Sequence, residues 1–172
     1  MSRLFSDNSY YFITVPTTHH TKFFNTFEKK SIILSRLSEI QSSFQLSDFD
    51  FSIISNHYHL ISYFKVGNTI PKILKLINGG SAYSLNKMTS NKKPVWGEYH
   101  IYLIKNDELL AKIRGYVVGN PLKHKEVKTL IELENYPFSS YQSLIKRLDK
   151  ITVDEYIKSV ISLDYEAIIK PT

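Results

Sequence analysis

The sequence contains no cysteine and no long apolar run. The absence of cysteine excludes disulfide bonds and zinc-thiolate sites, and it is consistent with a reducing cytoplasm. No apolar run approaches the roughly 20 residues that a membrane-spanning helix needs, and residues 1–8 lack the apolar segment of a secretory signal peptide. We therefore expect a cytoplasmic protein that does not engage a membrane.

The chain also shows no internal repeat, no low-complexity tract and no linker that would divide it. Its 172 residues can bury a sizeable core, and 42% hydrophobic with 22% charged residues is typical of a globular protein. We expect a single domain over residues 1–172, with a core at about 10–145 and a C-terminal helical extension at 146–172.

A net charge of +6 and a pI of about 9.3 favour a polyanionic partner such as nucleic acid. The 12 tyrosines and 10 phenylalanines strengthen this interpretation, because single-stranded bases stack on aromatic rings. Many small proteins are equally basic and bind no nucleic acid. Charge alone therefore does not decide between the two interpretations.

Hydrophobic periodicity predicts both strands and amphipathic helices. The expected strands lie at residues 10–15, 49–55, 57–64 and 95–104. Longer helices are expected to begin near residues 23, 69 and 106, and short helices follow them. This order indicates an α+β protein in which helices pack on one face of an antiparallel sheet.

Polar residues and helix breakers mark the ends of the later helices. Asn106 can cap a helix whose first turn is acidic, and Thr152 to Glu155 matches a capping box for the last helix. Gly119 and Pro121 are expected to end the helix that begins at Asn106. That helix would then stop shortly after Tyr116.

Two histidines on the third predicted strand are candidate metal ligands. Residues i and i+2 of a strand point to the same face, so His57 and His59 lie side by side, with Tyr58 on the other face. Two neutral imidazoles can begin a divalent metal site, which needs at least one further ligand and open positions. The alternative is a chance pair, because most such pairs bind no metal.

Tyr116 and Asn120 lie one turn apart on one face of a predicted helix. The amide oxygen of an asparagine suits Mg or Mn. A phenol has an ordinary pKa of about 10 and needs a nearby metal or base to act as a nucleophile. The alternative is structural, because Leu109, Ile113 and Tyr116 also form an ordinary buried stripe, and Asn120 can simply precede Pro121 at the helix end.

Taken together, these segments resemble a known family. Residues 56–60 resemble the histidine–hydrophobe–histidine signature of HUH nucleases, and residues 116–122 resemble the Tyr-x-x-x-Asn-Pro segment of REP-associated tyrosine transposases, which are relatives of single-tyrosine insertion-sequence transposases. Residues 94–99 and 136–141 resemble further landmarks of that family, in the expected order. Ser55 departs from the pattern, because the family often has proline there.

The resemblance implies a ferredoxin-like antiparallel sheet with an HUH endonuclease site. It implies that His57, His59 and Asn120 bind Mg or Mn, and that Tyr116 attacks single-stranded DNA to form a 5′-phosphotyrosine intermediate before rejoining. It also implies a hairpin-containing or REP-like substrate and a bacterial nucleoid location. A monomer and a homodimer both remain open.

Basic and aromatic residues near these motifs are candidate DNA contacts, although each could equally be a solvated charge or a core aromatic. They are Lys22, Lys87, Lys92, Lys93, Trp96, His100, Arg114, Lys123 and His124.

Three other functions remain open at this point. The first is a single-stranded nucleic-acid-binding module that cuts nothing, for which the histidine pair and Asn120 would have no use. The second is an HUH replication initiator or relaxase, which commonly carries further motifs. The third is a metal-dependent phosphodiesterase that uses water and leaves no covalent adduct.

Overall fold

The computed structural model describes residues 5–170. The first four residues of the 1–8 segment and the last two residues of the expected C-terminal extension lie outside this range. One antiparallel sheet runs through the molecule in the order β2-β3-β1-β4. Its strands are β1 (Ser9–Pro16), β2 (Ser47–Ile54), β3 (His57–Phe64) and β4 (His100–Ile104). The sheet and its surrounding helices confirm the α+β class.

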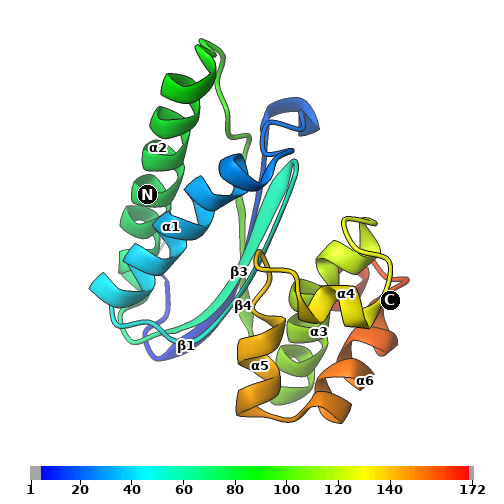
Figure 1. Ribbon diagram of the computed structural model, residues 1–172. Helices are drawn as coiled ribbons and strands as arrows, with labels where there is room; N and C mark the ends of the chain where they lie inside the picture. Colours follow the sequence, from blue (N-terminus) through cyan, green and yellow to red (C-terminus); the bar gives the residue numbers. More distant parts are fainter. Residues whose placement is uncertain (1–4, 171–172) are drawn as a thin grey trace.

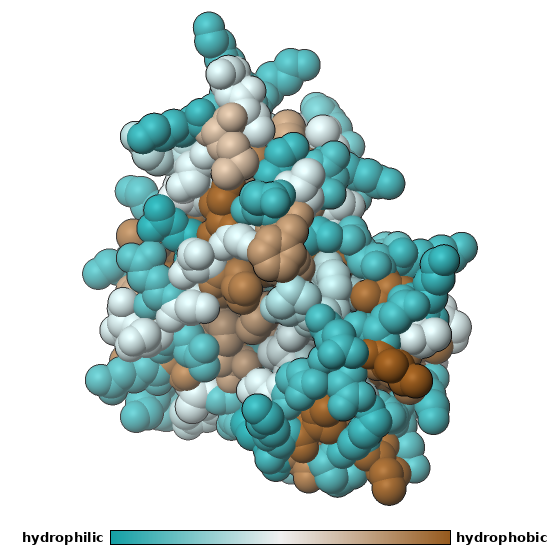
Figure 2. All heavy atoms as spheres, viewed as in Figure 1, coloured by the Kyte–Doolittle hydropathy of each residue, from teal (hydrophilic) through white to brown (hydrophobic). Residues whose placement is uncertain are grey.

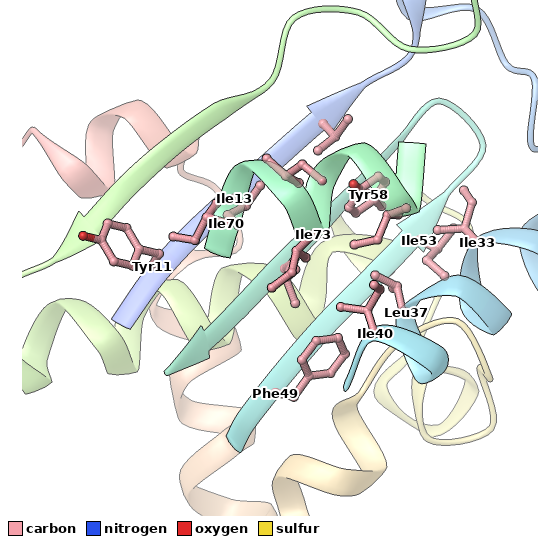
Figure 3. Packing of buried hydrophobic residues seen from close by; sticks show 14 of the residues in the cluster. Tyr11, Ile13, Ile33, Leu37, Ile40, Phe49, Ile53, Tyr58, Ile70 and Ile73 are labelled. Atoms are coloured by element: carbon pink, nitrogen blue, oxygen red, sulfur yellow. The ribbon is translucent and has the colours of Figure 1, made fainter. Parts of the chain in front are cut away.

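Two long helices, α1 (Phe27–Ser43) and α2 (Ile70–Thr89), cover one face of the sheet. The strands alternate, so that Tyr11 and Ile13 of β1 and Tyr58 of β3 point toward these helices and are buried. Figure 3 shows these side chains interleaved with apolar residues of both helices and of β2. This cluster is the larger part of the hydrophobic core.

The opposite face is covered by α3 (Asp107–Lys123), as Figure 1 shows. Phe12 and Ile61 point to this side and pack against Ile113 and Val117 of α3. The expectation that helices cover only one face is therefore wrong. The physical reason is that the alternate strand residues are also apolar, so both faces of the sheet must be buried.

The helix α3 does not end at Gly119 and Pro121 as predicted, but continues to Lys123. The backbone N–H of His124 still donates to the carbonyl of Asn120 at 3.0 Å. Gly119 instead serves a close helix contact, because a Cβ atom there would lie 2.8 Å from the side chain of Ile157. Tertiary packing thus overrides the local tendency to stop.

The helices after α3 form the layer on this side of the sheet. They are α4 (Leu130–Glu134), α5 (Tyr141–Arg147), α6 (Lys150–Val160) and α7 (Tyr165–Ile169). The cap of α3 is confirmed, because the side chain of Asn106 accepts from the N–H of Leu109 at 2.8 Å. The expected capping box at Thr152 is wrong, because α6 begins earlier and Asp149 caps it by accepting from Thr152 N–H at 2.8 Å.

Short 3₁₀ turns and a shortened edge strand complete the chain. The turns span Thr18–His20 and Gly67–Thr69. The strand β4 begins only at His100, whereas the prediction began at residue 95, because the preceding segment forms a single bridge between Thr17 and Trp96.

Over residues 5–170, no helix has both the length and the apolar character needed to cross a membrane. The face seen in Figure 2 is largely hydrophilic, with separate hydrophobic areas.

A buried ion cluster fixes α3 and α5 to β2. The carboxylate of Asp50 is fully buried and accepts from Nε of Arg114 at 3.1 Å and from Arg147. Asp48 bonds to Arg147 at 3.0 Å. An unpaired buried carboxylate would be costly, so the two arginines make this attachment specific.

Two glycines test whether α3 depends on close contact with α6. A Cβ atom at Gly115 would lie 2.4 Å from the backbone of Tyr156, whereas one at Gly79 would meet no atom of the described residues within 4 Å. We expect Gly115→Ala to lower the free energy of unfolding by about 1–3 kcal/mol through overpacking. Gly79→Ala is the matched control and should raise it by about 0.5–1 kcal/mol. Urea denaturation measures both, and equal stabilisation by the two variants would contradict the proposed contact.

Candidate functional site

The two histidines of β3 lie on the sheet face that α3 covers. His59 pairs with Ser52 of β2 on one side and with Thr14 of β1 on the other, and Thr14 pairs with His100 of β4. Directly opposed residues of antiparallel strands share a face, so these side chains form a row across the sheet. A pocket of about 460 Å³ opens along this row. It is lined by Thr14, Pro16, His20, Asn56, His57, His59, His100, Tyr116, His124, Asp164, Tyr165 and Glu166.

The helix α3 brings Asn120 against the histidine pair. Asn120 is fully buried, and its Oδ1 lies 2.9 Å from Nε2 of His57. The rings of His57 and His59 are 4.6 Å apart between centroids. The imidazole of His57 therefore lies next to both the His59 ring and the amide oxygen of Asn120, which is 63 positions away in the chain.

Burial makes both histidines neutral. It lowers the pKa of His57 to about 4, with a smaller contribution from His124, and it lowers the pKa of His59 well below its ordinary value. A neutral imidazole keeps a free lone pair on one nitrogen, which is the form that binds a metal ion. The protonation state of the pair therefore suits metal binding at neutral pH.

The polar atoms at this point fit a divalent cation. His59 is 2% exposed, and within the described part of the chain neither of its ring nitrogens has a hydrogen-bond partner. Nδ2 of Asn120 also has no partner there, but this NH₂ group is a donor and needs an acceptor such as a phosphate oxygen, not a cation. Such groups are costly unless something binds them. Residues 5–170 hold no group of three or more histidine or carboxylate side chains arranged for a metal, so the amide of Asn120 and outside oxygens would have to complete the site.

Tyr116 lies beside the histidines on the same helix face as Asn120. Its ring centroid is 5.3 Å from that of His59 and 6.3 Å from that of Phe12, and the residue is 6% exposed. Burial raises the pKa of the Tyr116 phenol well above its ordinary value, and the nearby Asp164 raises it further. The phenol thus stays protonated unless a positive charge acts on it.

Lys123 supplies one such charge. Its Nζ lies 5.3 Å from the centre of the Tyr116 ring and 2.8 Å from a carboxylate oxygen of Asp164. Asp164, Tyr165 and Glu166 reach the pocket from the segment around α7. Sequence reasoning missed these three residues, because no local spacing links them to Tyr116. It also missed His20 and Asn56, although Asn56 directly precedes the histidine pair.

The candidate DNA contacts fall into three groups. His100 and His124 line the pocket, and Lys123 lies next to Tyr116. Four lysines are exposed and lie outside the pocket lining. They are Lys22, Lys87, Lys92 and Lys93.

Arg114 and Trp96 make internal contacts instead. Arg114 is committed to the buried ion cluster with Asp50. Trp96 stacks on Phe24 with ring centroids 5.0 Å apart and donates from Nε1 to Ser81 at 3.0 Å, on the face of the sheet away from the histidines. Neither side chain is free to contact DNA in this conformation.

Comparison with known families assigns the chain to a class of DNA-mobilising proteins. The family described as "Transposase IS200 like" matches residues 5–119, which include both histidines and Tyr116. Because the match covers well over half of the sequence, the chain belongs to the IS200-like transposase family. Comparison with curated proteins gives no match.

Two solved structures are similar to this one. A REP-associated tyrosine transposase bound to a REP hairpin has a TM-score of 0.65 and 15% sequence identity, and the alignment covers 86% of this chain and 85% of that chain. A putative transposase from Deinococcus radiodurans R1 has a TM-score of 0.49 and 17% identity, covering 67% of this chain and 93% of that chain. The first likeness shows that this chain has the fold of a REP-associated tyrosine transposase.

The low pKa values of the two histidines predict a pH dependence of stability. Below the ordinary histidine pKa of 6.5, the unfolded chain binds protons that the folded chain does not. The free energy of unfolding of the metal-free protein should therefore fall as the pH drops from about 6.5 to about 5, by up to ~1.4 kcal/mol per pH unit for each histidine. Chemical denaturation with a chelator present measures this slope.

A pair of variants assigns that slope to the buried histidines. His59→Gln should flatten it, because the titrating group is removed. His19→Gln changes an exposed histidine and should leave the slope as it is. A slope that stays equally steep in His59→Gln would rule out the assignment.

Proposed function

We propose that this transposase cleaves and rejoins single-stranded DNA in a metal-dependent reaction, with Tyr116 as the nucleophile and a 5′-phosphotyrosine intermediate. One observation supports this proposal above the others. Tyr116 and Asn120 project from one helix toward the two neutral histidines of β3. Tyr116 lines the same pocket as both histidines, and Asn120 contacts His57. A structural tyrosine would not need buried, unpaired metal-binding groups beside it.

His57, His59 and Asn120 would hold the metal, and Mg or Mn suits this combination of nitrogen and amide-oxygen donors. When bound, the ion would polarise and orient the scissile phosphate. The role of the protein is to keep the two imidazoles neutral by burial and to hold the amide of Asn120 against them.

In the chemical step, the phenolic oxygen of Tyr116 forms a bond to phosphorus while the bond to the 3′ oxygen breaks. The phenol gives up its proton, and the leaving oxygen becomes a 3′-hydroxyl. The ammonium group of Lys123 lies over the Tyr116 ring and pairs with Asp164, so it would offset the negative charge of that carboxylate as the phenolate forms. A 3′-hydroxyl later attacks the phosphotyrosine and restores the phosphodiester, so no nucleotide cofactor is consumed.

The DNA partner follows from the charge and the pocket. His100 and His124 line the pocket where a phosphate would lie, and Lys123 lies beside Tyr116. The exposed lysines can contact the DNA backbone farther away. A hairpin-containing or REP-like strand is the proposed substrate, since the similar solved structure holds a REP hairpin. We place this activity in the cytoplasm, at the bacterial nucleoid, and it is compatible with a monomer or a homodimer.

A non-cleaving single-stranded DNA-binding module is the second candidate. The observation that favours it is the packing of Tyr116, whose ring contacts Phe12 and Tyr165 and whose pKa is raised. In that case the pocket would bind DNA without forming a covalent bond. The next experiment separates these two functions.

Replacing one of two neighbouring phenols tests which of them is the nucleophile. Tyr116→Phe should abolish the covalent protein–DNA adduct, because it removes only the attacking oxygen. Tyr165→Phe removes the second phenol of the pocket and should still give an adduct. The assay incubates each variant with single-stranded hairpins from the flanks of its own gene and Mn, followed by a denaturing gel. An undiminished adduct in Tyr116→Phe would refute the proposed nucleophile, and absence of adduct in every protein would favour the binding module.

Removal of the metal tests the role of the histidine pair. A chelator should abolish adduct formation, and added Mn or Mg should restore it. His57→Ala should lose Mn binding measured by calorimetry, since it removes a donor at the metal position, whereas His19→Ala should bind like the unmodified protein. Equal Mn affinity in the His57 and His19 variants would contradict the assigned ligands.

A further inference from the structure

Asn56 joins the metal-binding histidine to the loop after β1. Its Oδ1 lies 3.0 Å from Nδ1 of His57, and its Nδ2 donates to the backbone carbonyl of His20 at 3.3 Å. The opposite ring nitrogen of His57 faces Oδ1 of Asn120 at 2.9 Å. The imidazole of His57 is thus held between two side-chain amides.

The chemistry of the His20 carbonyl fixes which way the Asn56 amide points. A carbonyl oxygen only accepts hydrogen bonds, so the NH₂ group of Asn56 must face it. Oδ1 of Asn56 then faces His57 and requires a donor there. The N–H of His57 must accordingly be on Nδ1.

This assignment leaves a lone pair on the other nitrogen. A neutral imidazole carries a single N–H, so Nε2 of His57 points an unprotonated nitrogen at Asn120. A lone pair and an amide oxygen repel each other at 2.9 Å unless a cation lies between them. An ion bound by both atoms would relieve this repulsion, whereas a hydrogen bond from His57 to this oxygen would need the proton on Nε2.

The loop that carries the His20 carbonyl, the acceptor for Asn56, has an unusual backbone conformation. His19 and His20 have φ values of 55° and 53°, in the left-handed region that is uncommon for residues other than glycine. Thr17 holds the loop from both sides, because its N–H donates to the carbonyl of Asn56 at 2.9 Å and its hydroxyl donates to the carbonyl of Thr21 at 2.7 Å. These bonds aim the His20 carbonyl at the amide of Asn56.

From these contacts we infer that Asn56 is a positioning residue that sets the tautomer and ring orientation of His57, so that Nε2 is presented to the metal. The tautomer of His57 can be observed whether or not the protein cleaves DNA. The role of that tautomer in metal binding rests on the proposed function. Without Asn56, the remaining partner is Oδ1 of Asn120, and His57 would place its proton on Nε2 to donate to it. That hydrogen bond would occupy both atoms and compete with the metal.

The tautomer is observable in the metal-free protein by ¹⁵N–¹H correlation spectra of the imidazole ring at neutral pH. We expect Nδ1–H for His57 in the unmodified protein and Nε2–H in Asn56→Ala. Asn56→Asp keeps an acceptor-only group facing Nδ1 and should keep Nδ1–H. Alanine is compatible with the fold, since Ser55 and Asn56 form the turn between β2 and β3 without a positive φ.

Mn binding to the metal-free protein gives a second readout. Loss of a group that orients a ligating histidine typically weakens metal affinity by about 10- to 100-fold, and we expect a loss of this size in Asn56→Ala. Asn135→Ala removes an exposed amide away from the pocket and should bind Mn like the unmodified protein. An Nε2–H tautomer in the unmodified protein, or an unchanged tautomer in Asn56→Ala, overturns the inference.

These results are separable from the proposed function. If Tyr116 forms no adduct while His57 shows Nδ1–H and Asn56→Ala switches it, the proposed reaction fails and the positioning role stands. If the adduct forms while the tautomer does not respond to Asn56, the positioning role fails and the reaction stands.

Discussion

The packing of α3 against the sheet face that carries His57 and His59 is the contact on which the whole site depends. It brings Tyr116 and Asn120 against the histidine pair, which lies far from both of them in the sequence. Two features hold the helix there. Arg114 attaches it to the buried carboxylate of Asp50, and glycines on its other side let α6 approach closely. Neither feature lies at the histidine pair, yet both fix where Tyr116 and Asn120 lie relative to it.

Burial by this helix has opposite effects on the two kinds of functional group. It favours the neutral form of His57 and His59, which is the form that binds a metal ion. The same burial, together with Asp164, disfavours the phenolate of Tyr116. A cation resolves this conflict, because positive charge near the phenol stabilises the form that burial opposes. Lys123 lies beside the phenol, and a metal held by the histidines would add a second positive charge, so the proposed nucleophile is compatible with its burial.

Much of the fold follows from local patterns, but the site depends on long-range packing. The alternation of apolar residues predicted β3 with its correct ends and placed both histidines on one face. The end of α3 was mispredicted, because Gly119 and Pro121 favour a stop locally while contact with α6 and the helix after it keeps the helix intact. No sequence pattern around Asp164 indicates a functional role, since its effect on the pKa of Tyr116 arises only when the segment around α7 packs beside that tyrosine. The face shared by the two histidines therefore followed from local spacing, and Tyr116 and Asn120 were indicated by the family resemblance, whereas the position of Asp164 depends on packing between elements and was not predictable.

The continuation of α3 past Pro121 has a consequence for chemistry. Had the helix ended at Gly119, the side chain of Asn120 would have had no helical geometry to place it one turn from Tyr116. Because the helix continues, Asn120 is fully buried against His57, and His124 reaches the same pocket from the residue that ends the helix. On the opposite side of His57, the short turn between β2 and β3 supplies Asn56. One helix and one tight turn thus place a side-chain amide beside each nitrogen of the same imidazole, so the orientation of the His57 ring is set by residues that rigid backbone elements hold.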